Sequence, residues 1–229
     1  YTLQLNSHAK VFDWLSFGNN LTLTSDDKPS GSFDIRSTMA ANPVQPVFNK
    51  DGTYSNVMGN PLWYGDITNQ IGTANINNND TKGNNVLGNI YAELTLLPGL
   101  KFKSTGGIQA LFYNSRSWAP VYNFQPNPQT QAYLSEQFNK SMTYLWDNYF
   151  TYDKTFGSKH HLSLLAGSSA QNNRYDYLNG NKTDFPSNVT QQLNSGTGTA
   201  NTGGDASEWA LLSFMGRINY AYQDKYLVT

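Results

Sequence analysis

The stretch LSFGNNLTLT, residues 15–24, decides how this sequence folds. Its odd positions Leu15, Phe17, Leu21 and Leu23 are apolar, whereas the even positions are polar or glycine. Successive side chains of a β-strand point to opposite faces, so a period of two residues predicts a strand with one apolar and one polar face. We therefore expect this stretch to separate water from an apolar environment.

The same two-residue period recurs in segments of about the length that crosses a bilayer as a tilted strand. The further segments are residues 1–9, 85–96, 100–113, 142–153, 161–171 and 209–222. The chain closes on Tyr226-Leu227-Val228-Thr229, which we interpret as the start of an eighth strand. The pattern predicts an all-β fold, an antiparallel transmembrane β-barrel segment of about eight strands.

Connections between these strands alternate in length. We expect short turns at 10–14, 97–99, 154–160 and 223–225, and long polar loops at 25–84, 114–140 and 172–207. This alternation places all short turns on one side of the sheet, as in bacterial barrels with short periplasmic turns and long extracellular loops. Aromatic residues beside the short turns predict an interfacial girdle there, made of Phe12, Trp14, Phe17, Phe102, Tyr152, Phe156, Tyr220, Tyr222 and Tyr226.

Two parts of the long loops have a character of their own. Residues 34–42 are expected to form a short helix that is capped by Asp34 and ends before Pro43. Residues 194–205, rich in Ser, Gly, Thr and Asn, predict a flexible linker.

Composition supports a wall between lipid and water. Charged residues make up 14% of the 229 residues, against roughly 25% in ordinary soluble domains, and aromatic residues also reach 14%. The net charge of −1 offers no basic surface for nucleic acid. The absence of cysteine excludes disulfides, Cys-based zinc sites and thiol catalysis.

Aromatic residues in the long loops are the candidate substrate contacts. An exposed flat ring in a polar loop can stack on a sugar or a peptide. The alternative is that such rings pin a loop to its neighbours. The candidates are Trp63, Tyr64, Trp118, Tyr122 and Phe124.

Charged residues on the polar faces of the strands are expected to be solvated or paired with one another across the lumen, rather than to contact substrate. These residues are Glu93, Lys101, Lys103, Asp147 and Arg217.

No catalytic, metal or cofactor site is expected. His160 and His161 are adjacent in a strand, so they point to opposite faces and at most one of them can join His8 in a site. Residues 49–52 have turn chemistry but too few carboxylates for a calcium loop. The glycines of 196–199 lack the Lys-Ser/Thr of a phosphate-binding loop.

Several segments together resemble the barrel region of the SusC/RagA family of TonB-linked outer-membrane proteins. The most telling is LSFMGRINYAY at 212–222. The other matching segments are 1–6, 14–18, 39–43, 49–54, 98–103, 152–157, 161–162, 165–167 and 224–227.

The resemblance implies a 22-stranded barrel with a plugged lumen in the outer membrane of Bacteroidota-type bacteria. It implies uptake of a bulky polar nutrient, an oligosaccharide or a peptide, driven by TonB through the plug and assisted by a SusD/RagB-like surface lipoprotein. The plug and the remaining strands fall outside the pattern of 1–229, so these residues are expected to form a partial barrel domain that contacts outer-membrane lipid.

Three alternatives stay open at this point. A soluble or surface-exposed β-rich module for binding glycans or peptides would pack its apolar faces against a second sheet. A glycosidase would need two acids in a catalytic setting, and the sequence shows no such pair. A complete eight-stranded barrel would close on itself, although the short last strand argues against it.

Overall fold

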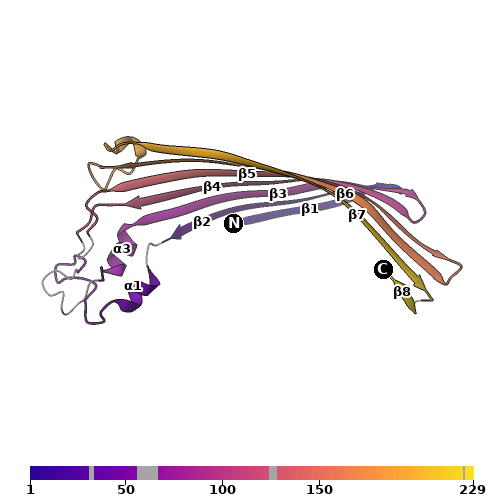
Figure 1. The fold of residues 1–229 in the computed structure, drawn as a ribbon, viewed down its shortest axis with the longest axis horizontal. Coiled ribbons are helices and arrows are strands. Elements are labelled where there is room, and N and C mark those ends of the chain that lie inside the picture. Colours follow the sequence, from indigo (N-terminus) through magenta and orange to yellow (C-terminus); the bar gives the residue numbers. More distant parts are fainter. Residues whose placement is uncertain (31–33, 56–66, 124–127, 224) are drawn as a thin grey trace.

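The computed structural model describes residues 1–30, 34–55, 67–123, 128–223 and 225–229. These residues form one antiparallel sheet in which every strand pairs with its neighbours in sequence, in the order β1-β2-β3-β4-β5-β6-β7-β8 (Figure 1). The strands are β1 (Thr2–Phe12), β2 (Leu15–Ser30), β3 (Asn78–Leu97), β4 (Leu100–Ala119), β5 (Tyr133–Phe156), β6 (His160–Thr183), β7 (Asn201–Tyr222) and β8 (Tyr226–Val228).

The sheet is open. In the described part of the chain, β1 pairs with β2 and β8 pairs with β7, and these two outer strands do not pair with each other. The expected antiparallel barrel segment of eight strands is thereby confirmed, and the alternative of a complete eight-stranded barrel is wrong.

Helices are few and lie at the end of the sheet where the long connections are (Figure 1). They are α1 (Ile35–Ala40), α3 (Gln70–Ile76) and the 3-10 turn η1 (Leu193–Ser195). The expected helix is confirmed as α1, because the Asp34 carboxylate accepts hydrogen bonds from the backbone N–H groups of Arg36 and Ser37. Among the described residues, no helix has the length and apolar character needed to cross a membrane.

The strand register sorts the side chains onto two faces. Residues directly opposite each other in an antiparallel pair share a face, and Leu94, Phe102, Phe150 and Ala166 lie opposite one another across β3 to β6. The Phe102 and Phe150 rings are 4.7 Å apart. We call this side of the sheet the apolar face and the other side the polar face.

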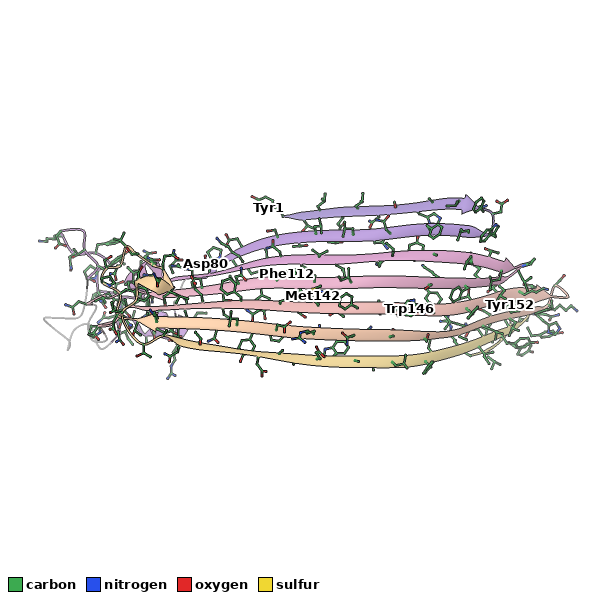
Figure 2. All side chains as sticks on the ribbon, turned by 90° about the horizontal axis from the view of Figure 1, so that it is seen from above. Tyr1, Asp80, Phe112, Met142, Trp146 and Tyr152 are labelled. Atoms are coloured by element: carbon green, nitrogen blue, oxygen red, sulfur yellow. The ribbon has the colours of Figure 1, made fainter. Side chains whose placement is uncertain are left out.

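Large apolar side chains on the apolar face stand uncovered. Trp146 is 61% exposed, Ile90 70% and Phe214 79%. Figure 2 views the sheet onto its surface, with Phe112, Met142, Trp146 and Tyr152 placed along its length. This is the face that the two-residue period predicts for contact with an apolar environment.

Aromatic residues gather beside the short turns, as expected. Phe12 stacks on Trp14 with ring centroids 5.5 Å apart, and Tyr222 stacks on Tyr226 at 6.4 Å. His160 joins this group, because its ring lies 4.9 Å from that of Tyr222.

The strands extend much further than the sequence predicts, and this corrects the expected loops. Residues 25–30, 78–84, 114–119, 133–141, 172–183 and 201–208 belong to strands. The predicted linker at 194–205 is also wrong in part, since it contains the last two residues of η1 and the start of β7. In these extensions both faces carry polar residues, so the apolar period disappears while backbone pairing continues.

A small core covers the far end of the apolar face. Trp118 and Leu134, neighbours on β4 and β5, are 1% and 0% exposed. Phe185 packs edge-on against Trp118 with ring centroids 4.9 Å apart, and Leu193 lies against the same group. Residues 184–200, which we call the cover segment, supply both of these contacts.

Candidate functional site

The polar face contains a zone of charged residues near the short turns. Glu93 and Lys103 lie directly opposite each other on β3 and β4. The Lys101 ammonium lies 2.8 Å from the Glu93 carboxylate, so part of the expected mutual pairing is present. Asp147 of β5 and Arg217 of β7 lie on the same face of the sheet.

Tyr91 is held in the middle of this zone. Its ring lies directly over Gly18, where a side chain would have no room. The Lys103 ammonium sits 4.1 Å from the centroid of the same ring, an arrangement that favours a cation–π contact. The Tyr91 hydroxyl lies 3.2 Å from Nδ1 of His8. The zone is therefore an organised surface rather than a set of independent charges.

The hydrogen-bonding capacity of one carboxylate in this zone is only partly used. Asp147 Oδ1 is buried and has no hydrogen-bond partner within the described residues. It lies opposite Thr105 and Ser169 on the neighbouring strands. A buried carboxylate oxygen requires a donor, so Asp147 is a position where water or another protein segment is expected to bind.

Further from the short turns, the polar face carries charges again at Asp26, Lys28 and Asp205, but between these residues and the charged zone lies an interval without charges. We call this part the amide band, and among its described positions on β1 to β7 no side chain is charged. Amide and hydroxyl side chains predominate there. The amides are Gln4, Asn6, Asn20, Asn85, Asn89, Gln109, Gln171 and Asn173.

A tyrosine cluster borders the amide band. Tyr113, Tyr175 and Tyr177 come from β4 and β6 and surround the buried Asn139 of β5. The Tyr175 hydroxyl donates to Asn139 Oδ1 at 2.7 Å and lies 3.4 Å from the Tyr113 hydroxyl. The Tyr175 and Tyr177 rings are 6.3 Å apart. Together they present a fixed aromatic surface on the polar face.

The predicted loop aromatics have different fates. Trp63, Tyr64 and Phe124 lie outside the described residues. Trp118 lies in β4 and not in a loop, and its burial against Phe185 fits the alternative of a ring that pins a connection in place. Tyr122 lies in the connection after β4, where its backbone pairs with Gln129. Partial burial raises the pKa of its hydroxyl.

Sequence reasoning missed the amide band and the tyrosine cluster. Tyr175, Tyr177 and Asn139 fell in segments predicted as loops, although they form β-strands. Their two-residue spacing was the signal that could have placed Tyr175 and Tyr177 on one strand face.

The adjacent histidines point to opposite faces, as expected. Nδ1 of His160 lies 2.6 Å from the Tyr220 hydroxyl, and Nε2 of His161 lies 3.0 Å from the Asp153 carboxylate. Each histidine therefore has its own partner at the short-turn end of the sheet.

Known proteins place this chain in a family. TonB-dependent receptor P26 of Formosa agariphila is 30% identical over 241 residues, which cover 100% of this chain and 23% of the receptor. TonB-dependent receptor P3 of the same organism is 29% identical over 223 residues, covering 96% of the chain and 22% of the receptor. The chain belongs to the TonB-dependent receptors. No family model matches it.

Solved structures show the fold of such a receptor segment. The RagAB peptide transporter matches 98% of this chain and 26% of its own chain, with a TM-score of 0.81 and 20% identity. The RagAB peptide importer in its open-open state matches with a TM-score of 0.80. The expected resemblance and the location in the bacterial outer membrane are thereby confirmed.

The chain spans about a quarter of the length of these TonB-dependent receptors and solved transporters. The related proteins are receptors and not enzymes, which confirms the expectation that the chain is not catalytic.

Proposed function

We propose that residues 1–229 form part of the wall of a larger outer-membrane barrel that imports a bulky polar nutrient, an oligosaccharide or a peptide. The apolar face contacts lipid and the polar face lines the lumen. The observation that carries the proposal is the contrast between exposed, uncharged side chains on one face and hydrogen-bonding side chains on the other.

The spacing of charges on β5 fits the thickness of a bilayer. On the apolar face, Lys140 and Lys154 bracket an uncharged interval from Met142 to Tyr152. That interval is about 33 Å long at 3.3 Å per residue. A strand tilt of about 40° reduces it to about 25 Å, the height of the apolar band of outer-membrane barrels.

The remaining length of the strands supports a role outside the bilayer. β5 and β6 are each 24 residues long, more than twice the roughly 9–11 residues that a tilted strand needs to cross. Their far ends and the cover segment would stand above the outer leaflet. A SusD/RagB-like lipoprotein is the proposed partner at this end, and TonB is proposed to act through a plug outside this chain.

The loop aromatics keep a place in this proposal. Trp63, Tyr64, Tyr122 and Phe124 are proposed to contact the nutrient as it enters from outside. Trp118 does not fit that role as it stands, because its ring is covered by Phe185.

Fractionation of the complete receptor that contains this chain tests the proposal. Membranes would be separated and solubilised in detergent, and proteins bound to the receptor would be identified by pull-down. We expect recovery from the outer membrane together with a surface lipoprotein. Recovery in the aqueous fraction without such a partner would favour a soluble binding module.

A further inference from the structure

The polar face is divided by charge at one level of the sheet. On one side of the boundary are Glu93, Lys103 and Asp147, and on the other side the amide band begins with Asn89 and Gln171. We propose that the amide band and the tyrosine cluster form a binding site for neutral, hydroxyl-rich solutes, with oligosaccharides as the chemical class. This inference rests on the proposed import function and names the ligand chemistry of the lumen wall.

The hydrogen-bonding capacity of the band matches hydroxyl groups. An amide side chain offers two donor hydrogens and a carbonyl acceptor, and a sugar hydroxyl likewise donates and accepts. A charged group that moved from water onto this surface would lose solvation without meeting an opposite charge. The band therefore favours neutral solutes over charged ones.

The aromatic part of the site is fixed before any ligand binds. Asn139 is 3% exposed, and its carbonyl accepts from the Tyr175 hydroxyl and from Gln137 Nε2 at 2.7 and 2.8 Å. Its amide nitrogen donates to the Tyr113 carbonyl at 3.3 Å. Because these bonds hold the rings, little side-chain freedom remains to be lost on binding.

A second ring stands at the edge of the band. Trp209 of β7 lies opposite Asn173 of β6 on the polar face. Asn173 is itself fixed, since its amide nitrogen donates to the hydroxyls of Ser141 and Thr143 at 3.0 and 2.8 Å. The indole thus places an aromatic ring beside anchored polar groups, a combination that suits the flat face of a sugar ring.

A peptide is the competing ligand, and its charges count against it here. A short peptide carries an ammonium and a carboxylate at its ends. The amide band offers no counter-charge to either, and Asp205, opposite Tyr177 of the tyrosine cluster, offers one to the ammonium alone. Peptide amides would still hydrogen-bond to Asn and Gln side chains, so the experiment must separate the two classes.

The test measures binding by the complete receptor in detergent against an array of neutral, acidic and amino-sugar oligosaccharides and short peptides. Calorimetry on the strongest neutral binder then compares Trp209→Ala with the matched control Trp146→Ala, which removes an indole from the apolar face. We expect neutral oligosaccharides to bind most tightly. Trp209→Ala should weaken that binding about fivefold, which corresponds to about 1 kcal/mol for one lost aromatic contact, and Trp146→Ala should leave it unchanged.

A gain of binding provides the second arm. Gln171→Glu places a negative charge in the middle of the band. It should weaken the binding of acidic oligosaccharides further and create measurable binding of chitosan oligomers, which carry ammonium groups. Strongest binding by peptides or acidic glycans, no binding by any neutral glycan, or equal effects of the two tryptophan variants would overturn the inference. These outcomes leave membrane residence and the lipoprotein pull-down untouched, so failure of this site is distinguishable from failure of the proposed function.

Discussion

Apolar side chains on the apolar face of the sheet are exposed in one region and buried in another. Across the middle of the apolar face, Ile90 and Phe214 are 70% and 79% exposed. At the extracellular ends of β4 and β5, Trp118 and Leu134 are 1% and 0% exposed. The difference lies in what covers them, because the chain supplies its own cover in one region and leaves the other to its surroundings.

The cover segment is attached by polar contacts as well as by Phe185. The Arg116 guanidinium donates to the Gln191 carbonyl at 2.8 Å, and Lys182 Nζ donates to the Gly196 carbonyl at 3.0 Å. Where water would meet Trp118, residues of the chain exclude it. Lipid excludes water from Ile90 without any segment of the chain having to be ordered over it. Exposed apolar residues therefore mark the part of the sheet that lies within the bilayer.

Removing the covered ring should have the largest effect. Trp118→Ala deletes a buried aromatic side chain, a change that costs about 3–5 kcal/mol in a packed core. We expect amide exchange in residues 184–200 to accelerate by about two to three and a half orders of magnitude, since 1.4 kcal/mol corresponds to tenfold. The control Phe214→Ala lies on the lipid-exposed part of the same face and should leave this exchange unaltered. Equal acceleration in both variants would contradict the contrast between the two regions.

The second largest effect is expected from a charge introduced into the uncovered region of the apolar face. Ile90→Arg puts a guanidinium at the middle of the apolar face, where the expected loss is about 2–4 kcal/mol of folding free energy in a bilayer. Asn89→Arg, one residue away on the polar face, should cost little. Urea titration of the complete receptor in lipid vesicles measures both, and a similar loss for the two variants would argue against lipid on the apolar side.

The ion pair on the polar face should contribute little. Lys101 and Glu93 side chains are 52% and 32% exposed, so their coupling should stay below about 1 kcal/mol and fall with salt. A double-mutant cycle with Lys101→Gln and Glu93→Gln measures it. A coupling well above that limit would mean that the charged zone is shielded from water, in contrast to the exposure seen here.

The smallest effect is expected at α1, which has no buried residue and depends on its cap. Hydrogen bonds from the Ser37 side chain and the backbone N–H groups of Ser37 and Arg36 lower the pKa of Asp34. A lowered pKa in the folded state means that the cap stabilises α1 above the ordinary Asp range and ceases to do so as pH falls through the lowered value. Protection factors of residues 35–41, which correct for the pH dependence of intrinsic amide exchange, should fall on acidification, and Asp34→Ala should abolish that dependence. A persistent dependence in the variant would assign it to another group.

The part of the fold inside the bilayer was predictable, because lipid and water impose opposite demands on alternate residues. The period at Leu15, Phe17, Leu21 and Leu23 placed β2 correctly for that reason. The extracellular halves of the strands were missed because water bathes both of their faces. Arg116 and Ser117 alternate between the two faces, yet both are polar.

The site was harder to predict than the fold, since it depends on which strands are neighbours. Asn139 gathers Tyr113 and Tyr175 from two flanking strands, 26 and 36 residues away in sequence. The burial of Trp118 depends likewise on Phe185, which has no periodic pattern linking it to β4. Both contacts require the register of the sheet.

The most direct test of the membrane wall is a spin-label scan of residues 86–94 in β3, in the complete receptor reconstituted into lipid vesicles. The chain contains no cysteine, so single cysteines introduced here add no second label within it. We predict that oxygen, which concentrates in lipid, collides most with labels at the even positions such as Ile90, and that a water-soluble nickel complex collides most at odd positions such as Asn89. Loss of this alternation, or its reversal, would contradict the assignment of the apolar face to lipid.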